Sequence, residues 1–132
     1  MLIHPLVVHF PIALWLASFL FDILAWRSPD SYYRRTAYWL VGLGLLGAAA
    51  SIALGWTDLF AVEAQGVGTA LVMRHQFHSW AAYAATAAYL VNFLWRWRTG
   101  NSVGRALLPL SLAGVALIVA AAYLGAGLRE VM

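Results

Sequence analysis

The stretch PLVVHFPIALWLASFLFDILAW, from Pro5 to Trp26, decides the fold of this chain. It contains one acidic residue, Asp22, and no lysine or arginine. At a helical rise of about 1.5 Å per residue, such a run matches a hydrocarbon layer about 30 Å thick. It is longer than the apolar part of a signal peptide, and no basic region precedes it. We therefore predict a retained transmembrane helix.

Three further apolar runs have a similar length, and they cover residues 36–56, 77–95 and 106–124. Together with residues 5–26 they predict four membrane spans. Because the connections between them are short, successive helices are expected to lie antiparallel. The predicted fold class is therefore all-α, an integral membrane four-helix up-down bundle that forms a single domain over residues 1–132. The longest predicted connection covers residues 58–76.

The composition supports a membrane protein and excludes several other classes. Hydrophobic residues make up 64% of the chain and charged residues only 10%, which leaves too few charges for a soluble surface. The net charge of +3 comes from arginines between apolar runs, so it indicates loops beside a membrane and not nucleic-acid binding. The chain has no cysteine, which excludes disulfides, thiolate metal sites and cysteine nucleophiles.

The distribution of the arginines predicts the orientation of the bundle. Six of the eight basic residues lie in the first and third connections: Arg27, Arg34, Arg35, Arg96, Arg98 and Arg105. Only Arg74 and Arg129 lie on the other side. The positive-inside rule then predicts a bacterial inner membrane protein whose two termini are periplasmic.

Four histidines and one aspartate are expected near the periplasmic surface. His4 and His9 lie at the start of the first span, His75 and His78 at the start of the third, and Asp58 at the end of the second. Ionisable groups at such depths cost several kcal/mol unless they face a partner or a cavity. Their convergence from three helices is the main functional signal in the sequence.

Two of these histidines suggest a haem site. His9 and His78 are the deeper pair, on helices that are diagonal neighbours and run in the same direction, as bis-histidine ligation of haem b needs. Arg74 is predicted to pair with a haem propionate, beside His4 and His75. Pro11 removes a helical hydrogen bond, so the start of the first helix is expected to be irregular and to re-aim His4.

Other interpretations remain open. Asp58 is expected to orient a ligand imidazole through its second nitrogen or to cap the site. A compact Cu or Zn site would instead use His75 and His78, His4 or His9, and Asp58. The small residues of the helices would leave room for a porphyrin, or only allow close helix packing. With a Cu or Zn site the protein would be a metal-binding subunit, and with close helix packing alone it would be a structural accessory subunit of a larger membrane complex.

Polar residues deeper in the apolar runs are interpreted as structural. Asp22 is expected to form an ion pair with nearby Arg27 or a structural hydrogen bond. Asn92 is expected to hydrogen-bond between helices. Ser18, Ser51 and Ser111 are expected to bond the backbone of their own helices. No combination of nucleophile, base and acid is present, so a stand-alone enzyme is not expected.

Several of these segments resemble one family. They are His4-Pro5-Leu6-Val7-Val8-His9-Phe10-Pro11-Ile12-Ala13, Asp22, Gly55-Trp56-Thr57-Asp58, the segment that starts with His78, and Gly125-Ala126-Gly127. In these segments the chain resembles the bacterial predicted membrane proteins catalogued as domain of unknown function 2231. The resemblance implies four transmembrane helices and marks His4, His9, Asp58 and His78 as functional positions.

The resemblance also implies a respiratory setting, because relatives are joined to Rieske iron–sulfur or c-type cytochrome domains. We therefore expect a cytochrome-b-like electron-transfer subunit in the lipid bilayer. Its expected partners are a periplasmic cytochrome c or Rieske-type protein and a quinone, and it is expected to be a homo-oligomer or a subunit of a complex.

Overall fold

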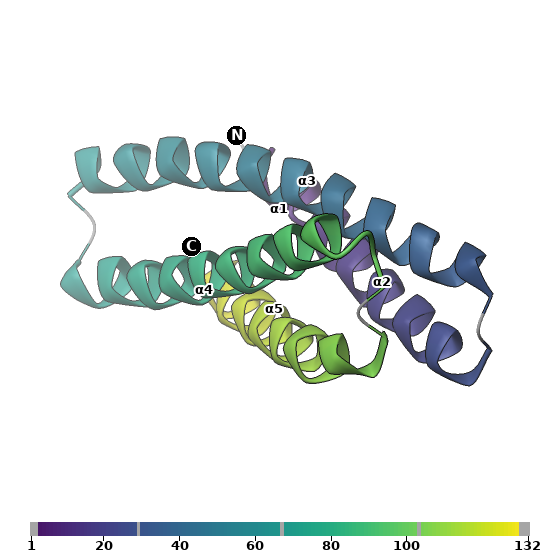
Figure 1. Cartoon of the computed structure of the whole chain (residues 1–132). Helices are drawn as coiled ribbons and strands as arrows, with labels where there is room; N and C mark the ends of the chain where they lie inside the picture. The colour runs from purple at the N-terminus through teal and green to yellow at the C-terminus, as the bar shows by residue number, and fades with distance from the viewer. Residues whose placement is uncertain (1–2, 29, 67, 103, 130–132) are drawn as a thin grey trace.

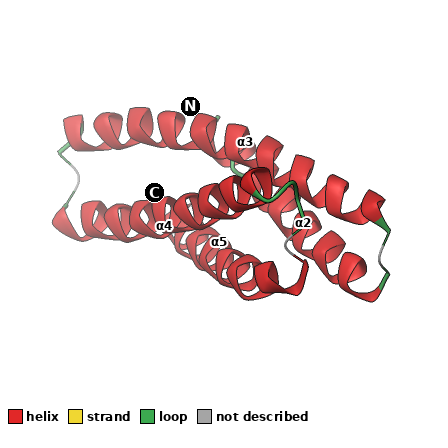
Figure 2. Ribbon diagram, viewed as in Figure 1, coloured by secondary structure: helices red, strands yellow, loops and turns green. Residues whose placement is uncertain are grey.

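The computed structural model describes residues 3–28, 30–66, 68–102 and 104–129, and this part of the chain contains helices and short connections but no strand (Figure 2). The elements are two short helices, α1 (His4–Val7) and η1 (Gly104–Leu107), and four long ones, α2 (His9–Arg27), α3 (Ser31–Ala64), α4 (Thr69–Arg98) and α5 (Leu108–Arg129). The predicted all-α class with four long helices is confirmed.

The four long helices run alternately up and down (Figure 1). Three helical stretches are long and apolar enough to cross a membrane, and they cover His4–Arg27, Ser31–Ala61 and Gly104–Leu128. Helix α4 is long enough as well, but it carries more polar side chains. In Figure 1 the two chain ends lie toward the α3–α4 connection, while the α2–α3 and α4–α5 connections lie at the opposite end.

Helices α3 and α4 are longer than the apolar runs predict. Helix α3 has 34 residues and α4 has 30, and both continue past the ends of their neighbours as a protruding hairpin (Figure 1). Asp58, Arg74 and His75 therefore lie within helices, and the predicted connection over residues 58–76 is wrong. The reason is that hydropathy marks only the part of a helix in lipid, while the flanking residues are polar but still form helix.

The irregular start of the first span is observed. Helix α1 ends at Val7 and α2 begins at His9, with Val8 as the turn between them. Pro11 cannot donate a backbone hydrogen bond to the preceding turn, which explains a break at this point.

The buried positions follow one spacing in all four long helices. In α2 they are Pro11, Trp15, Ser18 and Asp22, and in α4 they are Ala85, Tyr89, Asn92 and Arg96. In α3 they include Ala37, Val41, Gly44, Ala48 and Ser51, and the series of Leu107 in η1 continues in α5 with Ser111, Gly114, Ile118 and Ala121. The alternating intervals of four and three are the heptad spacing of helices packed at a small crossing angle. The hairpins α2–α3 and α4–α5 therefore present matching sets of core positions.

A stacked pair of aromatic rings lies at the centre of this core. The rings of Trp15 and Tyr89 are 4.0 Å apart between centroids and only 14° from parallel. Trp15 Nε1 donates a hydrogen bond to the carbonyl of Val41 at 3.3 Å. The Trp15 ring lies against Gly44, and a Cβ atom on Gly114 would lie 2.8 Å from Cε2 of Tyr89. Each large ring thus occupies the space that a glycine of the paired helix leaves open.

We predict that Gly44→Ala and Gly114→Ala destabilise the bundle by about 1–3 kcal/mol each, because the added methyl group overpacks a closed core. Gly127→Ala is the matched control, since no other side chain lies within 4 Å of its added Cβ atom. Denaturation of the detergent-solubilised variants measures the difference. Equal stability of Gly114→Ala and Gly127→Ala would contradict the packing described for the stacked pair.

Candidate functional site

Two histidines meet at the end of the bundle where the chain starts. His4 lies seven residues before Pro11 and His78 seven residues before Ala85, so both continue the core spacing of their helices. Their ring centroids are 6.2 Å apart and the ring planes are nearly perpendicular, at 84°. Both side chains are half-buried. We call His4 and His78 the histidine pair.

The surrounding helices hold both imidazoles in the same way. Nδ1 of His4 donates to the carbonyl of Ser51 in α3, and Nδ1 of His78 donates to the carbonyl of Ala121 in α5, each at 2.8 Å. A carbonyl only accepts, so Nδ1 carries the proton in each neutral ring. Nε2 then carries a free lone pair, which is the form of histidine that binds a metal.

A glycine makes room for each ring of the histidine pair. A Cβ atom on Gly55 would lie 3.2 Å from Cε1 of His4, and one on Gly125 would lie 2.9 Å from Cε1 of His78. Each glycine lies one turn after the residue whose carbonyl accepts the hydrogen bond. A larger side chain at either position would displace the imidazole, so these glycines position the pair.

His75 is the third member of the cluster. Its ring centroid lies 6.2 Å from that of His78, and its Nδ1 lies 3.3 Å from the hydroxyl oxygen of Ser79. Burial lowers the pKa of His75, and the nearby His78 and His4 lower it further, whereas Asp58 and Glu63 raise it. Protonation of His75 is therefore disfavoured beside the histidine pair, and Asp58 is an electrostatic neighbour of the cluster.

The structure places three of the predicted site residues, His9, Asp58 and Arg74, outside the histidine pair. His9, expected opposite His78, is exposed, and its Nδ1 donates to the carbonyl of Pro5 at 2.6 Å in its own helical turn. His4 holds the inward position because it continues the core spacing of Pro11 and Trp15. Backbone carbonyls, and not Asp58, bond the Nδ1 atoms of the pair, and the role of Asp58 as a cap of the site stays a prediction. Arg74 is exposed on α4, beside His75.

The compact Cu or Zn site is not assembled in the described part of the chain. No group of three or more histidine, aspartate or glutamate side chains there is placed to hold a metal ion. A structural zinc site takes about four protein ligands. The arrangement offers two imidazoles on opposite sides of the core, which suits a centre that needs only two protein ligands.

A second polar cluster, at the opposite end of the bundle, was not predicted in this form. Nη2 of Arg96 donates to both carboxylate oxygens of Asp22 at 2.6 Å, and Ser111 Oγ donates to Oδ2 at 2.9 Å. Asn92 joins the cluster by donating to Ser111 at 2.9 Å and accepting from Arg96 Nε at 2.7 Å. Asp22, Asn92, Arg96 and Ser111 are all buried.

The cluster of Asp22, Asn92, Arg96 and Ser111 tests the predictions made for three of these residues. The ion-pair partner of Asp22 is Arg96 and not Arg27, because Arg96 continues the core spacing of α4 while Arg27 lies on an exposed face. The alternative, a structural hydrogen bond of Asp22, is observed with Ser111 as its donor. Ser111 donates to Asp22 and not to its own helix backbone. Asn92 does hydrogen-bond between helices, as predicted. The signal in the sequence was the four-residue interval between Asn92 and Arg96 on the core face.

We predict that Asp22→Ala destabilises the protein by about 3–5 kcal/mol, because it leaves the guanidinium of Arg96 buried and uncompensated. Arg27→Gln, which removes a charge one turn away at the exposed end of α2, is expected to change stability by less than about 1 kcal/mol. Unfolding in a denaturing detergent provides the measurement. A larger loss of stability for Arg27→Gln than for Asp22→Ala would indicate that Arg96 is not the main partner of Asp22.

Comparison with known proteins gives one match. The family model described as "Predicted membrane protein (DUF2231)" matches residues 2–131. No curated protein and no solved structure matches the chain.

Proposed function

The chain belongs to the DUF2231 family of predicted membrane proteins, and we propose that it is a haem b-binding electron-transfer subunit whose axial ligands are His4 and His78. The observation that carries this proposal is the separation of the two rings. Metal–nitrogen bonds of about 2.0 Å on both sides of one metal atom, plus the distance from each nitrogen to its ring centre, give about 6 Å between centroids. The observed separation is 6.2 Å.

The chemistry of the donors supports the same role. Each Nδ1–H is bonded to a backbone carbonyl, which fixes the ring orientation and increases the basicity of Nε2. Two neutral imidazoles from opposite sides of a helical bundle are the ligand set of a low-spin b-type haem. Haem would supply a one-electron couple, and this chain would supply the ligands and their orientation.

The packing around the pair also supports a large group. Trp15, Ala85 and Tyr89 occupy deeper core positions and are fully buried, whereas His4 and His78 are half-buried at equivalent core positions. The bundle is therefore more open at the level of the histidine pair, where only α3 and α4 continue outward (Figure 1). A porphyrin edge would lie toward this open end, with exposed Arg74 as the proposed partner of a propionate.

The stacked rings define the inner limit of this site. Because Trp15 and Tyr89 fill the core below the pair, they would keep the cofactor at the outer end of the bundle. A cofactor at that depth is accessible to a protein partner in the adjoining aqueous compartment. We therefore keep a periplasmic cytochrome c or Rieske-type protein and a membrane quinone as the proposed partners, and the bacterial inner membrane as the proposed location.

The first test is a dithionite-reduced minus oxidised visible spectrum of protein purified from cells supplied with haem. We predict sharp α and Soret bands of a low-spin haem in the unmodified protein and in His9→Ala. His4→Ala and His78→Ala are expected to lose at least about 90% of the bound haem, because each removes one axial ligand. His9→Ala is the matched control, since His9 is exposed and faces away from the pair.

A further variant distinguishes the loss of the haem ligand from the loss of the fold. His78→Gln keeps a polar side chain that can bond the carbonyl of Ala121, so its elution profile and thermal stability report the fold while its spectrum reports the ligand. A featureless spectrum of the unmodified protein, or unchanged bands in both His4→Ala and His78→Ala, would refute haem binding at this site.

A single copper ion is the second candidate, since the same ring separation suits one Cu(I) held by two imidazoles. Metal analysis of the colourless protein distinguishes it from haem. About one copper per chain, lost in His78→Ala and retained in His9→Ala, would favour a metal-binding subunit over a cytochrome.

A further inference from the structure

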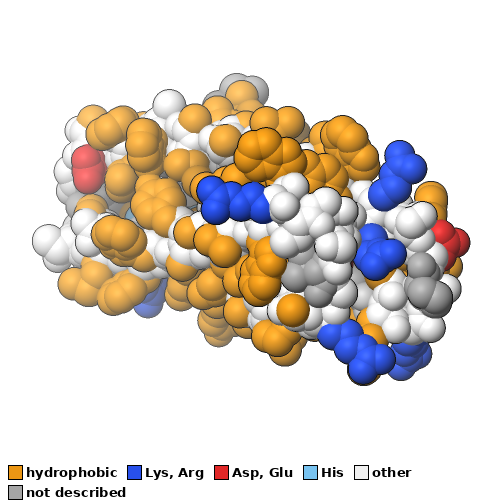
Figure 3. Space-filling model, viewed as in Figure 1, with side chains coloured by type: hydrophobic (Ala, Val, Ile, Leu, Met, Phe, Trp, Pro, Cys, Tyr) orange, Lys and Arg blue, Asp and Glu red, His pale blue; other side chains and the backbone are white. Residues whose placement is uncertain are grey.

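A pocket lies at the end of the bundle opposite to the histidine pair, where arginine side chains gather (Figure 3). It has a volume of about 190 Å³, and its walls come from α2, the start of α3, the end of α4 and η1. Arg34, Arg96 and Arg105 line it together with Trp26, Asn101 and Asp22. We call it the arginine pocket.

The charges around the arginine pocket do not balance. Three guanidinium groups face a single carboxylate, that of Asp22. This carboxylate is already engaged, because Arg96 contacts both of its oxygens and Ser111 donates to one of them. Within the described part of the chain, no ion pair involves Arg34 or Arg105. The pocket therefore has about two positive charges available to a ligand.

The pocket wall is built by a defined turn. Asn101 has a φ of 63° and Gly100 a φ of 62°, so the chain after α4 passes through the left-handed region that asparagine and glycine tolerate. The side chain of Asn101 donates to the carbonyl of Arg34 at 2.8 Å, and its oxygen lies 3.4 Å from Nη1 of Arg96. These contacts join the end of α4 to the start of α3, so the backbone of Arg34 and the side chain of Arg96 are held in place.

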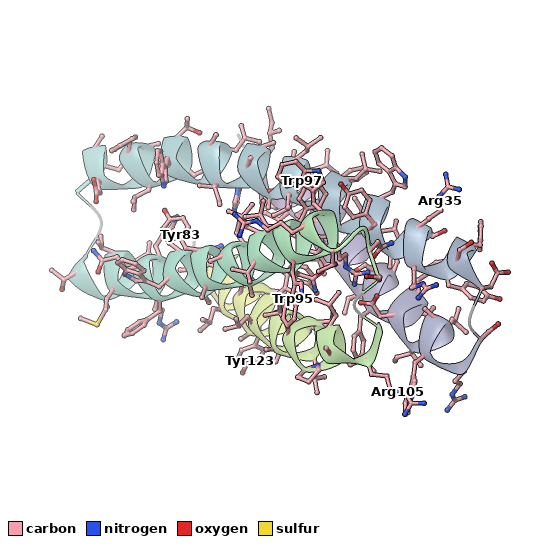
Figure 4. All side chains as sticks on the ribbon, viewed as in Figure 1. Arg35, Tyr83, Trp95, Trp97, Arg105 and Tyr123 are labelled. Atoms are coloured by element: carbon pink, nitrogen blue, oxygen red, sulfur yellow. The ribbon has the colours of Figure 1, made fainter. Side chains whose placement is uncertain are left out.

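One side of the pocket lies at the surface. Trp26 is 49% exposed, and the guanidinium carbon of Arg105 lies 5.4 Å from the centre of its ring. Figure 4 shows Arg105 at the outer edge of this end of the bundle, with Arg35 on the neighbouring helix α3. Exposed tryptophan beside arginine is typical of the level of the lipid headgroups. A ligand in this place would be in contact with the membrane surface.

We propose that the arginine pocket binds a phosphate group, and that an anionic phospholipid of the adjoining leaflet presents it. The planar guanidinium group matches phosphate oxygens with paired hydrogen bonds, so two available arginines suit a phosphodiester. Basic pockets between transmembrane helices are typical sites for anionic headgroups. The exposed Trp26 wall favours a lipid over free phosphate, because it continues the pocket into the interfacial layer. The proposal does not depend on a cofactor at the histidine pair.

The test compares thermal unfolding of the detergent-solubilised protein with added phosphatidylglycerol, phosphatidylcholine or inorganic phosphate. Phosphatidylglycerol is expected to raise the Tm by about 4 °C or more relative to phosphatidylcholine, because a ligand of the folded state stabilises it. The double variant Arg34→Gln/Arg105→Gln is expected to lose this shift. Arg98→Gln, which removes one arginine of the same end outside the pocket, is the control and is expected to keep it.

Phosphorus analysis of the purified proteins measures directly whether phospholipid is bound, without heating the protein. We expect retained phospholipid in the unmodified protein and in Arg98→Gln, and at least a threefold loss in the single variant Arg105→Gln. An equal Tm shift in the double variant would overturn the pocket as the binding site. A full shift with inorganic phosphate alone would overturn the lipid as its source, and no shift with either would refute the phosphate site.

Discussion

The stacked rings of Trp15 and Tyr89 fix how the two helical hairpins meet. Each ring packs against a glycine of its paired helix, and the rings contact each other across the core at a centroid distance of 4.0 Å. Such a contact permits little sliding, because a shift by one turn would place a large ring against Ala48 or Val41 and not against Gly44. The heptad spacing then transmits this register to both ends of the bundle.

At the end of the bundle where the chain starts, this register brings two histidines together. Counting back from the stacked pair along the core positions leads to His4 on one hairpin and to His78 on the other. Their surroundings correspond as well, since each Nδ1 donates to a carbonyl that is followed one turn later by a glycine. The pair is therefore a consequence of two matching hairpins in a fixed register, and the two donors reach the same depth from opposite sides.

The sequence predicts the number, type and order of the long helices, because four apolar runs of membrane length leave few other arrangements. It does not predict where α3 and α4 end, since Asp58 and His75 lie beyond the apolar runs while the helices continue. The choice between His4 and His9 depends on the core spacing and not on the break at Val8. Counting the core positions back from Asp22 through Trp15 and Pro11 leads to His4, and so it identifies His4 as the inward histidine.

The partner of Asp22 could not be read from local spacing, because Arg96 lies far from it in the sequence. Its charge places Arg96 in the third predicted connection, although the residue falls on the core face of α4. A buried charge in a membrane helix needs a compensating charge at the same depth. In a bundle whose hairpins correspond, the position equivalent to Asp22 in α2 is Arg96 in α4, so the symmetry of the core positions identifies the pair.

The two ends of the bundle use this correspondence in opposite ways. Equivalent positions carry the same residue at the end where the chain starts, His4 and His78, and opposite charges at the other end, Asp22 and Arg96. Two imidazoles at one depth suit the proposed ligand between them, whereas two identical charges in a dry core would repel. The end with Asp22 and Arg96 avoids this repulsion because the two hairpins carry different residues there. That difference satisfies Asp22 within the core and leaves Arg34 and Arg105 available at the surface.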